Sequence, residues 1–191
     1  LLIPANTRIK FTLNFKKLAF KVVNIGIHEL ESTAKSVDAP PSPKNPDGSP
    51  KCTVPFIHDS KARKDVSNPF RIAEYLDEAY PDTPKIVPAR TRALHYVFVE
   101  KVSDQFNTPL SRLYMPLHVE FTPEVVQVFI ERFGNIPLSP TDEQRAEAWK
   151  KAQAGLYVNE LVPVYGTGDG LFLTGEKPFF ADLALATMLA T

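Results

Sequence analysis

A proline at position 55 marks the part of the sequence with the clearest chemical meaning. Val54, Pro55, Phe56 and Ile57 form a short apolar run that predicts a strand. Proline has no N–H group to donate to a sheet, so Pro55 must lie at the strand's entry, at an edge or in a tight turn. A proline in such a place is a candidate for a cis peptide bond. We therefore expect a special backbone conformation directly before this strand.

The chain has few cysteine and histidine residues that could act as redox groups or metal ligands. Cys52 is the single cysteine, which excludes an internal disulfide and any cysteine-based metal site. We expect it to be a small apolar residue on a strand rather than a redox group. The histidines at positions 28, 95 and 118 have no Cys, Asp or Glu at ligand spacing, and we expect His58 on a surface hairpin turn. The sequence therefore predicts no metal site.

The charge and hydropathy of the chain narrow the class of protein. Among 191 residues, 22 basic and 22 acidic side chains leave no net charge, so nothing electrostatic favours nucleic acid or an anionic membrane as partner. No apolar run approaches the roughly 20 residues that span a bilayer. The first residues, Leu-Leu-Ile-Pro-Ala-Asn, do not resemble a signal peptide. We expect a cytosolic protein.

The first half of the chain mixes helical and strand patterns. Phe70, Ala73, Leu76 and Tyr80 recur at helical spacing. Before them, Asn68 suits a helix cap and Pro69 a first helical turn. The predicted elements are a helix at 7–18, a strand at 19–25, a helix at 28–37, a loop at 38–50, the strand at 54–57 and the helix near 70–80. This order is most of a thioredoxin-like α/β unit whose first strand is largely missing.

The second half reads as helical throughout. A proline-punctuated linker at 81–88 separates a first domain, 1–80, from a second, 89–191. An apolar stripe from Leu94 to Phe106 predicts a helix. Thr122-Pro123 and Thr141-Asp142 are typical helix starts, and a last apolar helix begins at Ala181. The predicted fold class is an α/β thioredoxin-like domain followed by an all-α domain.

The order of these motifs resembles the glutathione transferase family. The Val54-Pro55 strand, the polar hairpin and the helix ending in Tyr75-Leu76-Asp77 are similar to the glutathione-binding half of such enzymes. Tyr80-Pro81-Asp82-Thr83-Pro84 is close to what fungal members show. The segment from Thr174 to Asp182 resembles the one that leads into a core helix of the family. The resemblance covers nearly the whole chain, and the order and spacing are more specific than any single motif.

The resemblance implies a glutathione site and assigns its residues. Val54, before the expected cis-proline Pro55, would offer its backbone N–H and C=O to the cysteinyl part of glutathione. Asn68 and Pro69 fall where the family has a Glu/Asp-Ser pair that holds the γ-glutamyl group. Asn68 supplies no anion for the ligand's ammonium, and Pro69 lacks both the hydroxyl and the N–H. Each lost hydrogen bond to a charged group costs about 1.5–3 kcal/mol, so affinity should fall at least about tenfold.

The resemblance also implies where catalysis would take place. Ile3 stands where the family has the Ser or Cys that activates the thiol, and isoleucine has no donor. Asn6 and Thr7, at the start of the first helix, could donate to the thiolate instead, or they could only cap the helix. Tyr96 and Tyr114 could line an apolar pocket for an electrophile, although core packing is the commoner fate of such residues.

Three interpretations remain at this point. The first is a fungal-type glutathione transferase that uses glutathione as co-substrate, without a metal, to conjugate small apolar electrophiles in detoxification or to cleave an ether. The second is a non-catalytic member kept as a binding or protein-interaction module. The third is a truncated or mis-spliced product, since the chain stops within an expected core helix. By resemblance we also expect a homodimer.

Overall fold

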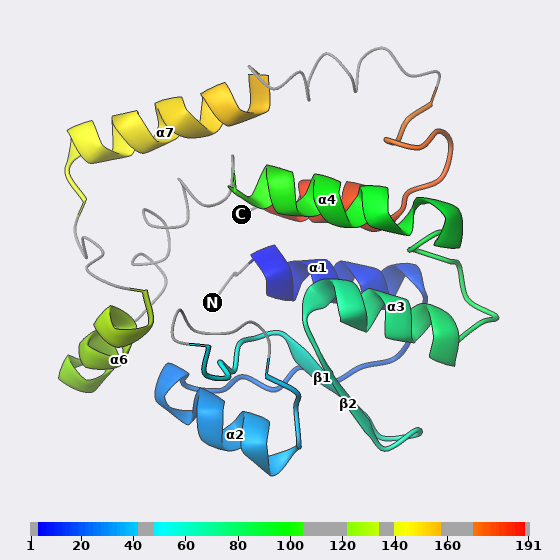
Figure 1. Cartoon of the computed structure of the whole chain (residues 1–191), viewed down its shortest axis with the longest axis horizontal. Coiled ribbons are helices and arrows are strands. Elements are labelled where there is room, and N and C mark those ends of the chain that lie inside the picture. The colour runs from blue at the N-terminus through cyan, green and yellow to red at the C-terminus, as the bar shows by residue number, and fades with distance from the viewer. Residues whose placement is uncertain (1–3, 42–47, 105–121, 134–139, 158–169, 190–191) are drawn as a thin grey trace. The chain divides into compact units, whose positions relative to one another are not determined.

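The computed structural model describes residues 4–41, 48–104, 122–133, 140–157 and 170–189, which form two compact units. One unit covers residues 5–87, and the other contains Pro4 and the described residues from Pro88 onward. The chain thus divides between Val87 and Pro88. The division into 1–80, a linker at 81–88 and 89–191 stays a prediction. Each unit is described by itself (Figure 1).

The first helix, α1 (Pro4–Phe15), begins three residues before the predicted start. Proline suits this first position because its missing N–H has no partner in a helix there anyway. The helix ends in a left-handed residue, Lys17, with a φ of 56°. The N–H groups of Leu18 and Lys17 donate back to the carbonyls of Leu13 and Asn14, each at 2.9 Å. These bonds satisfy the last carbonyls of the helix and turn the chain away.

The prediction of a strand at 19–25 was wrong. These residues form neither helix nor strand, and Phe20 and Val23 are 40% and 70% exposed. Aromatic and β-branched residues favour extended backbone, but a strand also needs a neighbour with which to exchange hydrogen bonds. Within the described ranges, the sheet consists of two other strands only. The segment therefore has the composition of a strand, but no described strand pairs with it.

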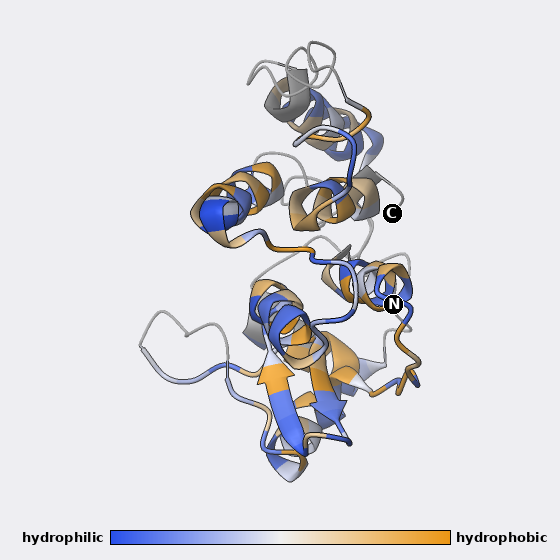
Figure 2. Cartoon of the chain, turned by 90° about the vertical axis from the view of Figure 1, so that its right-hand side faces the viewer, coloured by the Kyte–Doolittle hydropathy of each residue, from blue (hydrophilic) through white to orange (hydrophobic). Residues whose placement is uncertain are grey.

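Those two strands form a hairpin directly after Pro55. Strand β1 (Phe56–Asp59) pairs antiparallel with β2 (Lys64–Ser67), with Phe56 opposite Ser67 and Asp59 opposite Lys64. The predicted strand at 54–57 exists, but it starts two residues later because Pro55 cannot donate to the ladder. The hairpin is hydrophobic where β1 begins and β2 ends, and hydrophilic toward its turn (Figure 2). Its apolar end is thus the one that packs into the core.

Asp59 organises the turn end of the hairpin. Its Oδ1 accepts hydrogen bonds from the N–H groups of Lys61 and Ala62 at 2.9 and 3.2 Å. Its Oδ2 accepts from the hydroxyls of Tyr75 and Tyr80, both at 2.7 Å. Burial by itself would raise the pKa of Asp59, but these hydrogen bonds outweigh it and lower that pKa to about 2. The carboxylate therefore ties the hairpin turn to the end of the following helix.

Two further helices complete this unit. A 3₁₀ turn (Ile27–Glu29) leads into α2 (Leu30–Ser36), which confirms the helix predicted at 28–37. Helix α3 (Pro69–Ala79) confirms the amphipathic pattern of its sequence. The core of the unit brings together one residue of α1, one of β2 and three of α3: Ile9, Val66, Ile72, Tyr75 and Leu76.

A buried ion pair joins α1 to the far end of α3. Lys16 Nζ lies 2.7 Å from Asp77 Oδ1, and the Lys16 side chain is fully buried. Lys16 also donates to the carbonyl of Pro84 at 3.0 Å. Asp77 Oδ2 accepts from the N–H groups of Ile86 and Val87 at 2.9 and 2.8 Å. One carboxylate thus connects two helices with the segment that follows them.

The second unit is helical in its described parts. A 3₁₀ turn (Ala89–Thr91) precedes α4 (Arg92–Val102), and three further helices follow, namely α6 (Pro123–Phe133), α7 (Asp142–Tyr157) and α9 (Phe180–Leu189). The predicted caps are confirmed: Thr122 Oγ1 accepts from Val125 N at 3.4 Å, and Thr141 Oγ1 from Gln144 N at 3.3 Å. No helix in the described ranges has both the length and the apolar content that crossing a membrane requires.

Helices α4 and α9 pack together around a buried histidine. His95, on α4, is 3% exposed, and its ring lies 5.7 Å from the ring of Phe179. Neither ring nitrogen has a hydrogen-bond partner within the described residues. Burial lowers the pKa of His95 because it disfavours the charged ring, and the nearby carboxylate of Asp182 opposes this only in part. Folding therefore favours the neutral form of this histidine.

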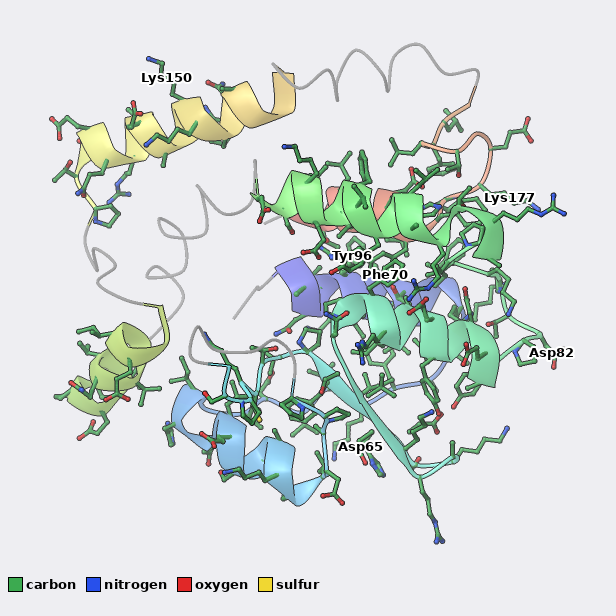
Figure 3. The ribbon with its side chains drawn as sticks, viewed as in Figure 1. Asp65, Phe70, Asp82, Tyr96, Lys150 and Lys177 are labelled. Atoms are coloured by element: carbon green, nitrogen blue, oxygen red, sulfur yellow. The ribbon has the colours of Figure 1, made fainter. Side chains whose placement is uncertain are left out.

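The Lys16–Asp77 pair leads to a first prediction. Asp77→Ala should lower the free energy of unfolding by about 3–5 kcal/mol, because it leaves the buried Lys16 charge uncompensated. Asp82→Ala is the matched control, since Asp82 lies exposed on the same segment (Figure 3) and should cost less than about 0.5 kcal/mol. Urea unfolding followed by circular dichroism measures both. Equal losses in the two variants would contradict the role given to the ion pair.

The buried histidine leads to a second prediction. Because the pKa of His95 is lowered on folding, the unfolded chain takes up a proton first as the pH falls through the ordinary value of 6.5. The contribution of the neutral ring is complete above that pH and is lost below it. We expect wild-type stability to fall more steeply than that of His95→Phe between pH 7.5 and 5.5. If the urea midpoints of the two proteins change with pH to the same extent over this interval, His95 does not contribute to the pH dependence of stability.

Candidate glutathione site

The start of α3 is closed by its own capping residue. Asn68 has a φ of 74°, and its Oδ1 accepts from the N–H groups of Phe70 and Arg71 at 3.0 and 3.2 Å. The carbonyl of Asn68 accepts from Ile72 N at 2.9 Å, and Pro69 has no N–H. Every N–H group of the first helical turn is therefore absent or already bonded. This turn has no backbone donor left for a ligand.

Val54 and Pro55 lie beside this cap. The Val54–Pro55 peptide bond is cis, as the sequence pattern suggested. Phe56 is paired with Ser67, so Pro55 and Asn68 each extend this pair by one residue at the same end of the hairpin. In Figure 3, Phe70 marks the first turn of α3, whereas Asp65 lies toward the opposite, turn end of the hairpin. The four residues predicted to hold glutathione thus come together.

From Ala5 onward, helix α1 belongs to the same unit. Asn6 and Thr7 lie inside the first turn of α1, because the helix begins at Pro4. One turn later, Ile9 packs with Ile72 and Leu76 of α3. The two helices run side by side and begin on the same side of the unit (Figure 1). Asn6 and Thr7 thus lie inside the helix rather than before it, and the two roles predicted for them, donor to a thiolate or helix cap, stay predictions.

The side-chain oxygen of Asn6, Oδ1, is a buried polar atom without a hydrogen-bond partner among the described residues. Thr7 already takes part in an interaction. A buried polar atom without a partner costs about 1–3 kcal/mol, so a ligand N–H or O–H group that donates to Asn6 Oδ1 gains affinity. A thiolate would have to accept a hydrogen bond from the other end of this amide, the Nδ2 group.

The electrostatics of the site favour anions. The first turns of α1 and α3 contain no acidic residue, and a helix start carries partial positive charge. Arg71 adds an exposed cation on the first turn of α3. The sequence interpretation did not include this residue, although its place three positions after a capping Asn could have indicated it. A thiolate or a carboxylate suits such surroundings.

Of the two tyrosines predicted to line an electrophile pocket, Tyr96 is among the described residues. Tyr96 lies on α4 in the other unit and is 44% exposed (Figure 3), and Tyr114 and Ile3 lie outside the described residues. Cys52 is a free, half-buried thiol. Within the described ranges, no group of three or more His, Cys, Asp or Glu residues could hold a metal ion.

Comparisons with known proteins decide the family. The family described as Glutathione S-transferase, C-terminal domain, matches residues 93–191, which is more than half of the chain. A glutathione S-transferase of Ceriporiopsis subvermispora, solved in complex with glutathione, is 30% identical with a TM-score of 0.82, over 97% of this chain and 75% of that one. The chain belongs to the glutathione S-transferase family.

Other members agree with this assignment. A second Ceriporiopsis subvermispora glutathione S-transferase in complex with glutathione is 28% identical with a TM-score of 0.84, and the match covers 98% of this chain and 78% of the other. The glutathione S-transferase-like protein ustS of Aspergillus flavus is 27% identical over 96% of this chain and 71% of its own. The fold is that of the family, a thioredoxin-like N-terminal domain and a helical C-terminal domain.

Proposed function

We propose that this glutathione S-transferase binds glutathione at the end of the β1–β2 hairpin and transfers it to small apolar electrophiles. The observation that supports this most is the meeting of the cis Val54–Pro55 bond with Asn68 in one unit. The backbone of Val54 holds the cysteinyl part of glutathione in this proposal. Asn68 and Pro69 form the edge of the site toward the γ-glutamyl group.

In the proposed reaction, the glutathione thiolate is the nucleophile. A free thiol titrates near pH 8.5, so ionising it two units lower requires about 2.7 kcal/mol of stabilisation. In this proposal the positive end of α1 and a hydrogen bond donated by Asn6 Nδ2 supply this, with Thr7 beside them. The sulfur then forms a bond to an electrophilic carbon as the bond to the leaving group breaks. In an ether, the broken bond is C–O and the departing oxygen takes up a proton.

A second function is favoured by the departures from the family pattern. The N–H groups of Phe70 and Arg71 are bonded to Asn68 rather than open to a ligand, and Pro69 has none. A site that lacks these donors holds the glutamyl end weakly. The alternative is therefore a non-catalytic member that serves as a binding or protein-interaction module.

The remaining expectations complete the proposal. Tyr96 and Tyr114 line the electrophile pocket, the protein works in the cytosol as a detoxification enzyme, and glutathione is its co-substrate without a metal. The outer side of α4 exposes Leu94 and Val97 at 70% and 63%. Such a pair of apolar side chains suits contact with a second copy of the chain, in keeping with a homodimer.

Glutathione binding tests the proposed function directly. Calorimetric titration of the folded protein should give saturable binding with a Kd of about 1 mM or below, weakened by the lost glutamyl contacts. Assays with model electrophiles then follow on the same sample. Absence of any binding heat from a folded sample would exclude the enzyme and leave the interaction module.

The role of Asn6 can be tested separately. Asn6→Ala should lower kcat/KM for conjugation by about 10- to 100-fold, since a hydrogen bond to a charged group is worth about 1.5–3 kcal/mol. The pH midpoint of kcat/KM should also rise by about one to two units, because the thiolate is less stabilised. Asn14→Ala, an exposed asparagine of the same helix, is the matched control. An unchanged pH profile in Asn6→Ala would place thiol activation elsewhere.

A further inference from the structure

The polar atoms of Asn68 are not equally available to a ligand. Its Oδ1 is occupied by the N–H groups of Phe70 and Arg71, and this network assigns the NH₂ group to the other side of the amide. The side chain is half-buried, and its Nδ2 has no hydrogen-bond partner within the described residues. Asn68 therefore presents a donor, and no acceptor, to whatever lies against the hairpin end.

Asn68 thus lacks a free acceptor, and no described carboxylate at the start of α1, at the start of α3 or at the apolar end of the hairpin supplies one. The first turns of α1 and α3 hold no acidic residue. The carboxylates of the hairpin, Asp59 and Asp65, are both bonded: Asp59 to two tyrosine hydroxyls, and Asp65 to His58 at 2.8 Å. Asp59 moreover lies at the turn, and Asp65 opposes His58 rather than Phe56. The charged side chain at the start of α3 is the cation Arg71.

An ammonium group needs acceptors or a negative charge to replace its hydration. A carboxylate needs donors, which Asn68 Nδ2 and the Arg71 side chain supply, and the partial positive charge of the helix start favours it as well. Among the described residues, the start of α3 thus offers two side-chain donors to the carboxylate of a γ-glutamyl group and no carboxylate to its amine.

We propose that this site takes γ-glutamyl-type thiols by their carboxylate and thiolate and does not recognise the α-amino group. The substrate class is then a thiol peptide with an acidic acyl end, whether or not that end carries an amine. Asn68 is the specificity-determining residue. The inference rests on the proposed function, since it concerns the same site.

Two thiols that differ only in the amine test the inference. Glutathione and glutaryl-cysteinylglycine, which has hydrogen in place of the amino group, are titrated into the wild type and into Asn68→Asp. Asp caps a helix as well as Asn and tolerates a positive φ, so the variant keeps the start of α3 and adds a negative charge. Asn14→Asp adds the same charge at an exposed position of α1. Thermal unfolding confirms that each protein is folded.

The wild type and Asn14→Asp should bind the deaminated thiol at least as tightly as glutathione. Asn68→Asp should shift the ratio of the two Kd values toward glutathione by about tenfold or more, the effect of one hydrogen bond to a charged group. A tenfold preference of the wild type for glutathione would overturn the inference and leave the proposed function intact. An unchanged ratio in Asn68→Asp would overturn the role of Asn68. Failure of both thiols to bind would overturn the proposed function, and the inference with it.

Discussion

The buried pair of Lys16 and Asp77 is the constraint on which the first unit depends. Removing two charges from water is costly, and the cost is recovered only where the geometry is good and the remaining lone pairs are bonded. Here the carboxylate also accepts from Ile86 N and Val87 N, and the ammonium also donates to Pro84 O. The ends of α1 and α3 therefore have one well-bonded arrangement with the segment up to Val87.

This arrangement has consequences at the other ends of the two helices. A helix behaves as a rod that rises about 1.5 Å per residue, so fixing its end and its apolar face also fixes its start. Lys16 and Ile9 attach α1 at two points, and Asp77 and Ile72 attach α3. The starts that carry Asn6 and Asn68 are thereby held next to the apolar end of the hairpin. The site is a product of the core, built where three elements begin or end.

The chemistry of the site follows from how its polar groups are already used. Asn68 bonds to its own helix with its oxygen, which stabilises α3 and withdraws two N–H groups from a ligand. Asn6 differs, because its buried Oδ1 has no partner among the described residues and can still accept a hydrogen bond from a ligand. In the helical unit, Asp182 resembles Asn68: its oxygens accept from Leu173 N at 2.7 Å and Phe179 N at 2.9 Å, which orders the start of α9. Capping residues thus decide which helix ends remain open to ligands.

The sequence by itself determined the elements whose signals are local. The amphipathic pattern of α3, the Thr122 and Thr141 caps and the special bond at Val54–Pro55 all depend on residues close together in the chain, and each is present. The order of motifs was also enough to indicate the family. The candidate site residues of the first unit followed from that resemblance, and their meeting at one place could not be read from spacing alone.

Only the tertiary structure decided what depends on distant partners. The segment 19–25 has strand composition, but pairing is a property of two segments, and no described strand lies against it. Lys16 carries a charge that by itself favours solvent, yet it is buried because Asp77, 61 positions away, supplies its counter-charge. Asn68 Oδ1 accepts from the N–H groups of Phe70 and Arg71, so the Arg71 side chain is left as a donor at the start of α3. Local propensity acts within a few residues, whereas burial and charge pairing are settled by the whole fold.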